Sequence, residues 1–146
     1  MTAALPPIGE LLPHTPPSLL LDELVQLTAD GAVARVRVTE QSLFRESQGV
    51  PAIVALEYMA QTIAAFSGAR RRDLGLPAQL GLLVGCRRMT LEVEHFRSGD
   101  ELLVEARHVG SSATLGQFDC AVSCAGTVVA RGVLSVYEGP LDRTPP

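Results

Sequence analysis

Alternating apolar and polar side chains predict that most of this chain forms β-strands. From Ala34 to Val38 apolar residues alternate with arginines, which is the pattern of a strand with one buried face. Similar stretches are bounded by turn-forming residues at 29–31, 97–100, 110–112 and 125–126. The predicted strands are 18–28, 33–38, 79–94 in one or two pieces, 101–109, 114–125 and 127–137.

One segment departs from this pattern and predicts a single long helix. Residues 51–72 are apolar on almost every side, and Pro51 lies at or just before the first turn, where its missing N–H does no harm. The arginines at 70–72 complement the negative end of the helix dipole before Gly75. A helix that is apolar all round is expected to be buried all round.

The order of these elements predicts the fold. Two strands, one buried helix and four further strands make an α+β arrangement, in which the sheet must curl around the helix to bury it. This is the hotdog fold, a curled antiparallel sheet wrapped around one long central helix. We expect one such domain over 1–138 and a flexible tail over 139–146. The exposed edges of the sheet favour pairing into a dimer.

Composition and charge limit the function. The chain has 146 residues and a formal net charge of −4, which argues against nucleic acid as its main partner. It has no apolar run of about 20 residues, the length that spans a bilayer, and its start lacks the features of a signal peptide. We therefore expect a cytoplasmic protein. The three cysteines are not spaced for a disulfide or a zinc site, and we expect no metal and no cofactor.

Glu57 and Gln61 are the polar exceptions within the apolar helix. Spaced four residues apart, they lie on one helix face and form a short polar stripe. Burial of an unpartnered carboxyl group raises its pKa, and a carboxyl group of raised pKa suits general acid catalysis. The alternative is structural: Glu57 could be held by arginine or backbone amides, and Gln61 could satisfy a loop carbonyl. The residues alone leave both interpretations open.

Four motifs in the same order carry a resemblance to a known family. They are the Pro-rich segment 12–22, the helix motif Glu57-Tyr58-Met59-Ala60-Gln61, the run 83–88 and the turn 98–102. With these motifs the chain resembles the 3-hydroxyacyl-acyl-carrier-protein dehydratases over most of its length. Gly-Val-Pro-Ala at 49–52, followed by the helix motif, is similar to the branch associated with aryl polyene biosynthesis.

The resemblance implies an activity and a set of site residues. The family removes water from a (3R)-3-hydroxyacyl thioester on acyl carrier protein, giving a trans-2-enoyl thioester, in aryl polyene or fatty acid-type chain building. A base takes the C2 proton, an acid helps the 3-hydroxyl to leave, and amides hold the thioester oxygen. By resemblance the acid is Glu57, oriented by Gln61, and the amide of Gly85 polarises the thioester. Free amides near Pro51 and Ala52, at the helix start, add to that field.

The chain departs from the family at the base. The fatty acid synthesis enzymes have a catalytic histidine in a His-Phe-Pro-Gly loop before the helix, and the matching loop here, 43–51, has none. We expect His14 to be the base, since the first hairpin brings the start of strand one beside the end of strand two, which leads into that loop. The alternative is that His14 only packs the Pro-rich segment. His95 and His108 are expected on the surface.

Other functions and partners follow from the same features. A hotdog thioesterase, with Glu57 activating water, and a non-catalytic hotdog subunit of a heterodimeric dehydratase are the alternatives. The expected partners are acyl carrier protein and either a second copy or a related hotdog chain. Arg87 and Arg88, with the arginines at 70–72, are expected to dock the acidic carrier protein. For 70–72 alone, a solvated helix end is the alternative.

Overall fold

The computed structural model of the chain describes residues 4–77, 81–112 and 114–138. Its short elements are the 3-10 helices η1 (Ile8–Glu10) and η2 (Ala52–Val54) and the two-residue strands β3 (Val50–Pro51) and β5 (His95–Phe96). Its long elements are β1 (Glu23–Leu27), β2 (Gly31–Arg37), α1 (Ala55–Asp73), β4 (Leu82–Leu91), β6 (Glu101–Ser112), β7 (Leu115–Cys124) and β8 (Thr127–Tyr137).

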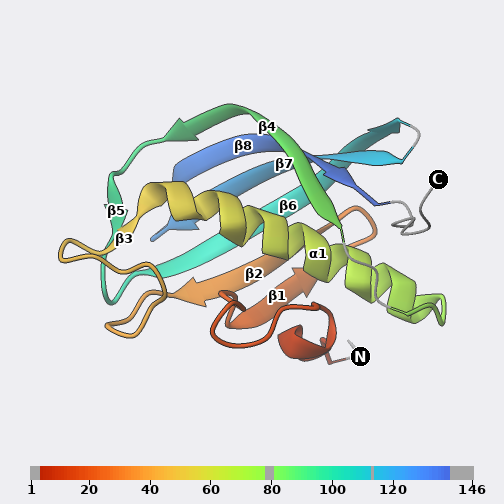
Figure 1. The fold of residues 1–146 in the computed structure, drawn as a ribbon, viewed down its shortest axis with the longest axis horizontal. Helices are drawn as coiled ribbons and strands as arrows, with labels where there is room; N and C mark the ends of the chain where they lie inside the picture. Colours follow the sequence, from red (N-terminus) through yellow and green to blue (C-terminus); the bar gives the residue numbers. More distant parts are fainter. Residues whose placement is uncertain (1–3, 78–80, 113, 139–146) are drawn as a thin grey trace, which may run out of the picture.

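Six strands form one antiparallel sheet in the order β1-β2-β6-β7-β8-β4. Helix α1 lies across the concave side of this sheet, with β1 and β4 at opposite edges (Figure 1). Strands β3 and β5 pair separately beside the start of the helix. The predicted arrangement, a curled antiparallel sheet around one long helix, is confirmed.

The core lies between the helix and the middle of the sheet. Leu102, Val104 and Ala106 of β6 have no exposed surface and alternate with residues on the outer face, as a half-buried strand requires. Phe66 of α1 packs edge-on against Phe118 of β7, with ring centroids 6.0 Å apart. The alternation that predicted the strands is therefore also what builds the core.

Two predicted boundaries are wrong. The first strand begins at Glu23 instead of residue 18, because the N–H of Leu20 donates to the side chain of Gln61 (2.9 Å) and not to a neighbouring strand. The turn expected at 110–112 is part of β6, which continues to Ser112 opposite Leu115. The tail expected at 139–146 lies outside the described residues.

The helix is not buried all round, which corrects a second expectation. Glu57, Ala60, Ala64 and Ser67 are half-buried and follow one another along one face of α1. The cause is the position of β4 at the sheet edge, which leaves a groove between that strand and the helix. The segment Ala52–Asp73 is long and apolar enough to cross a membrane, so the expectation that no stretch has this length is wrong. Of its most apolar stretch 56% is buried inside the fold, as in a core helix.

Candidate active site

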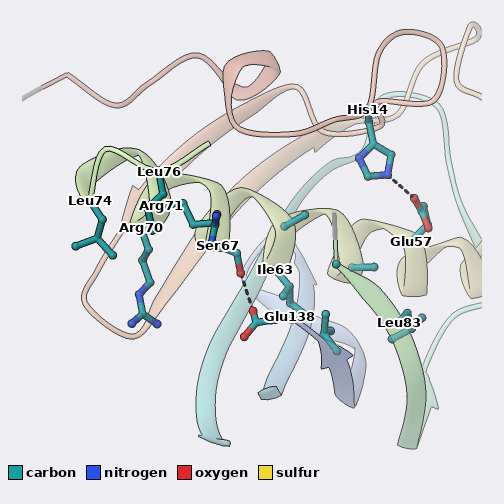
Figure 2. Close-up of a pocket in the computed structure, with 14 residues that line it drawn as sticks. His14, Glu57, Ile63, Ser67, Arg70, Arg71, Leu74, Leu76, Leu83 and Glu138 are labelled. Atoms are coloured by element: carbon teal, nitrogen blue, oxygen red, sulfur yellow. Dashed lines mark hydrogen bonds and ion pairs between the residues drawn. The ribbon is translucent and has the colours of Figure 1, made fainter. Parts of the chain in front are cut away.

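A groove of about 360 Å³ runs along α1 between the helix and β4, a volume typical of sites for small ligands. Figure 2 shows His14 and Glu57 at one end of it and Ser67 with Glu138 further along the helix. The lining residues are His14, Glu57, Ala60, Ile63, Ala64, Ser67, Arg70, Arg71, Leu74, Leu76, Gly81, Leu83, Val136 and Glu138.

The structure brings the predicted acid and the predicted base together. His14 Nε2 lies 3.7 Å from Glu57 Oε1, and both side chains line the groove. The side chains are 28% and 45% exposed, so the full burial expected for Glu57 is wrong in the single chain. A separation of 3.7 Å is longer than a direct hydrogen bond, and it leaves both groups available to a third molecule.

Gln61 holds Glu57 in place. Its side chain has no exposed surface, and its Nε2 donates to Glu57 Oε1 (2.8 Å) and to the carbonyl of Ser18 (2.8 Å). Its Oε1 accepts the N–H of Leu20 (2.9 Å). The amide thus links the helix to the N-terminal segment that carries His14, and it does not itself line the groove.

A second close contact, between Leu11 and Gly68, packs the same N-terminal segment against the helix. A Cβ atom at Gly68 would lie 2.2 Å from the carbonyl oxygen of Leu11, so only glycine allows this approach. His14 lies between Leu11 and Ser18, and both of these anchors fix the chain that carries it. His14 Nδ1 is buried and has no hydrogen-bond partner among the described residues. The proximity of His14 to the site, argued from strand pairing, is thus produced by packing on α1.

Tyr58 follows Glu57 in the chain but belongs to the core. It is 3% exposed and packs against Phe96, with ring centroids 6.0 Å apart. Burial, with a smaller contribution from Asp22, raises the pKa of Tyr58 to about 12. Its hydroxyl therefore stays protonated at neutral pH and cannot act as a base there.

The backbone groups expected to hold the thioester are Pro51 and Ala52 at the helix start and the amide of Gly85. The N–H of Ala52 donates to the carbonyl of Glu94 (2.9 Å), and Pro51 has no N–H, so neither of these two residues supplies a free amide at the helix start. Gly85 pairs with Ser135 within the sheet and is not among the described residues that line the groove. These assignments were carried over from the family by resemblance. A resemblance does not show which backbone groups pair with one another in this chain.

The other two histidines are placed outside the groove. His95 pairs with Pro51 across β3 and β5, and its Nε2 is 3.9 Å from Glu46 Oε2. Its side chain is only 21% exposed, so the expectation of an exposed residue is wrong. His108 contacts Ser111 Oγ (2.7 Å) and lies edge-on to Phe118, with ring centroids 5.1 Å apart; it is partly buried.

Arg70 and Arg87 lie in different parts of the surface. Arg70 and Arg71 line the groove, with the Arg70 guanidinium 5.4 Å from the ring centroid of Phe66. Arg87 contacts Gln117 (3.4 Å), a neighbour of the buried Phe118. Since side chains alternate along a strand, Gln117 and Arg87 lie on the outer face of the sheet.

One polar pair in the groove was missed from the sequence. Ser67 Oγ donates to Glu138 Oε1 at 2.8 Å, joining α1 to the end of β8. The place of Ser67 follows from helical spacing, because it is ten residues beyond Glu57 and lies on the same face. Glu138 is 71 residues further along the chain, and no local pattern marks it.

The family model described as ApeP dehydratase matches residues 6–144. The chain belongs to the ApeP-like dehydratase family. This confirms the predicted hotdog dehydratase, including its aryl polyene branch.

Individual proteins agree with the family. The 3-hydroxyacyl-[acyl-carrier-protein] dehydratase FabZ of Brucella ovis is 28% identical over 142 residues, covering 90% of this chain and 86% of that protein. The structure of the dehydratase heterocomplex ApeI:P from Xenorhabdus doucetiae superposes with a TM-score of 0.89 at 28% identity, covering 94% of this chain and 93% of that one. They confirm the predicted enzyme class, a lyase of the kind that dehydrates 3-hydroxyacyl chains on acyl carrier protein.

A more distant structure shares the fold alone. The PaaI protein of the E. coli phenylacetic acid degradation operon has a TM-score of 0.62 at 16% identity, covering 78% of this chain and 80% of that one. The hotdog architecture is therefore confirmed by proteins well beyond the family, and the fold by itself does not select the reaction.

Proposed function

We propose that this chain removes water from a (3R)-3-hydroxyacyl thioester carried on acyl carrier protein, with His14 as base and Glu57 as acid. The observation that supports this most is the distance of 3.7 Å between His14 Nε2 and Glu57 Oε1 on the wall of one groove. The reacting carbons, C2 and C3, are about 1.5 Å apart. The acid and the base of such a reaction must therefore lie within a few ångström of each other.

The two groups divide the proton transfers between them. In the proposed step His14 Nε2 accepts the C2 proton, the C2–H electron pair forms the C2=C3 bond, and the C3–O bond breaks. Glu57 gives its proton to the departing hydroxyl group, which leaves as water. The products are an imidazolium on His14 and a carboxylate on Glu57. Transfer of one proton between these neighbours restores the starting state.

Gln61 has a positioning role in this proposal. Its Nε2–H fixes the Glu57 oxygen that also lies nearest to His14. The remaining Glu57 oxygen is then the one that carries the proton toward the substrate. Polarisation of the thioester oxygen by the Gly85 amide stays a prediction, as does carrier docking on Arg87 and Arg88.

The test is product analysis with a carrier-bound 3-hydroxyacyl thioester. We expect the acyl chain to lose one water and to stay attached to the carrier, as seen by mass spectrometry of the intact carrier protein. Release of a free acid would instead support the thioesterase alternative. A non-catalytic subunit predicts a third result. The chain alone would give no reaction, and addition of the partner would restore it. The mixture would also stay active when this chain carries Glu57→Gln.

We also propose a second hotdog chain as the partner, paired along β4. This strand ends the sheet, so one of its edges has no strand partner within the described residues. Leu82, Leu83 and Val84 are 44%, 41% and 59% exposed there, and an exposed apolar edge favours strand pairing. Because β4 also borders the groove, such a partner would close it. A related chain is favoured over a second copy by the heterocomplex named for the Xenorhabdus doucetiae structure.

Thiol labelling, together with the molecular mass of the complex, tests whether the partner pairs along β4. Cys86 of β4 is exposed, whereas Cys124 lies at the far end of β7. We expect the related chain to produce a complex of higher mass by light scattering and to slow maleimide labelling of Cys86, with Cys124 labelling unchanged. Unchanged labelling of both thiols in a complex would place the interface elsewhere.

A cytoplasmic location stays a prediction.

A further inference from the structure

The last turn of α1 extends past the neighbouring strands β1 and β2 and leads into two exposed leucines (Figure 1). Leu74 is 72% exposed, more than any other large hydrophobic residue that the structure describes, and Leu76 is 46% exposed. Single exposed leucines are ordinary on protein surfaces, but apolar residues gathered in one place mark contact sites. The end of the helix therefore offers apolar surface to another molecule.

The backbone holds these leucines in fixed positions. Gly75 has a φ of 70°, and the N–H of Leu76 donates to the carbonyl of Arg71 (2.8 Å), which makes a helix C-cap on a left-handed glycine. Arg71 Nε also donates to the carbonyl of Pro77 (2.6 Å). The leucines thus stand on an ordered turn and not on a frayed helix end. No leucine side chain takes part in these hydrogen bonds, so the cap does not explain an apolar residue at Leu74.

Positive charge gathers beside the leucines. The segment 70–77 holds three arginines and one acidic residue, Asp73. Arg72 pairs with Glu10 (2.7 Å), but neither Arg70 nor Arg71 makes an ion pair with a carboxylate among the described residues. This is a local concentration of positive charge on a chain whose net charge is −4.

We propose that this tip, formed by Leu74 and Leu76 with Arg70 and Arg71, binds an anionic membrane surface. Peripheral membrane segments combine the same groups: apolar side chains enter the boundary of headgroups and acyl chains, and arginines stay among the anionic headgroups. Figure 2 shows Leu74 and Arg70 at the outer end of the helix. The four residues also line the groove, so a bound tip would turn that part of the groove towards the membrane. This binding does not depend on the proposed dehydration.

An acidic protein is the competing occupant of the tip. It would also attract arginines, but a stable protein interface buries about 800 Å² on each partner and needs a broad matching surface. The leucines here stand on a single projecting turn, which suits insertion into a bilayer better. The negative net charge of the chain gives it no general attraction to anionic lipids, so binding to them must come from a local site.

A fluorescent reporter tests whether the tip enters the membrane. The chain has no tryptophan, so Leu74→Trp provides a single one at the tip. The full chain is mixed with vesicles of phosphatidylcholine alone or of phosphatidylcholine with phosphatidylglycerol. We expect the tryptophan emission to shift to the blue, and to be quenched by brominated lipids, only with phosphatidylglycerol. Val109→Trp, at a residue of β6 that is 50% exposed, is the control and should show neither change. No shift at position 74, or equal shifts at both positions, would overturn the proposal.

Sedimentation with the same vesicles measures the affinity without a reporter. Leu74→Ser should weaken binding about tenfold, because one leucine is no longer buried in the membrane. Arg70→Gln should weaken it about fivefold, an effect that decreases as salt increases. Arg107→Gln, an exposed arginine elsewhere on the sheet, is the matched control and should bind like wild type.

Two other results would assign the tip to a protein and refute membrane binding. One is vesicle binding that is unaffected by Leu74→Ser or absent in wild type, together with weaker turnover of carrier-bound substrate by Leu74→Ser. The other is vesicle binding that disappears when the related hotdog chain is added. Since Leu74 and Arg70 are exposed, thermal unfolding of their variants should match wild type, which separates loss of binding from loss of folding.

Discussion

The two carboxylates that face the groove differ in what holds them. Glu57 lies beside an imidazole, at 3.7 Å from His14 Nε2, and accepts a hydrogen bond from the fully buried Gln61. Glu138 accepts a hydrogen bond from the hydroxyl of Ser67. An imidazole exchanges protons near neutral pH, whereas a serine hydroxyl does not. The same functional group thus lies beside an imidazole in one place and beside a hydroxyl further along the groove, and only the first pairing suits proton transfer.

The strongest test of this difference is Glu57→Gln. Glutamine keeps the size of the side chain and its oxygen still accepts from Gln61, but it cannot supply the proton that the leaving hydroxyl needs. We expect dehydration to fall by at least about 10³-fold on every substrate, with the melting temperature within a few degrees of wild type. The rate of product formation and a thermal unfolding curve measure both.

The matched control for this change is Asp119→Asn, an equivalent substitution of an exposed carboxylate outside the groove. It should retain full activity. Near wild-type turnover by Glu57→Gln would mean that Glu57 is structural and that the proposed acid is wrong.

His14→Ala removes the imidazole that distinguishes the surroundings of Glu57 from those of Glu138. Activity should fall by about 10²–10⁴-fold, the usual contribution of a positioned base. An imidazole accepts a proton only when it is neutral, so activity that depends on one declines in acid. The variant should lose this acidic limb of the pH–rate profile while still binding the thioester.

His95→Ala and His108→Ala serve as controls, because neither residue lines the groove. Both should keep the acidic limb. An active His14→Ala enzyme with an unchanged pH profile would contradict the assigned base and revive a mechanism in which Glu57 acts through water.

The features that could be predicted from the sequence were those with a local signature. Alternation from Ala34 to Val38 and apolar residues all round α1 were enough for the strands, the helix and the curled sheet. The family motifs pointed to Glu57 and, by elimination of the loop histidine, to His14. Their proximity was correct although its cause is different, since the segment of His14 is held by Gln61 and Gly68 and not by strand pairing.

The features that could not be predicted depend on which surfaces meet. The half-exposed side of α1 arises because β4 ends the sheet, and a helical pattern does not contain that information. The contact of Ser67 with Glu138 joins residues 71 positions apart. The amide of Ala52 is taken by Glu94 in a short strand pair that no periodicity marks. Pairing over long separations, and not residue type, decided each of these.

Gln61→Leu should have an intermediate effect, confined to the part of the groove where Glu57 and His14 lie. Leucine fills the space but leaves the N–H of Leu20 and the carbonyl of Ser18 without the partners that Gln61 supplies. These two groups are only part-buried. A fully buried group left unpaired costs about 1–3 kcal/mol, so the melting temperature should fall by a few degrees at most. Glu57 also loses its donor, and we expect kcat to fall about tenfold with KM little changed.

Thr62→Val separates positioning from stability in this case. Thr62 is fully buried on the same helix, and its hydroxyl donates to the carbonyl of Tyr58 (2.8 Å). This variant should also lower the melting temperature but leave kcat as it is. Equal losses of kcat in the two variants would show that Gln61 acts through stability only.

The smallest effect is expected from charge reversal at Arg87 and Arg88, neither of which lines the groove. Arg87 is on the outer face of the sheet beside Gln117, where a cation can attract an acidic carrier protein without touching the acyl chain. Arg87→Glu with Arg88→Glu should raise KM for the carrier-bound substrate a few-fold and leave KM for a short thioester mimic unchanged. The difference should shrink as salt increases, because exposed charges are screened. Arg107→Glu, an exposed change elsewhere on the sheet, is the control. Equal losses on both substrates would mean that the two arginines affect the fold or the groove, and carrier docking would then have to be sought near Arg70 and Arg71.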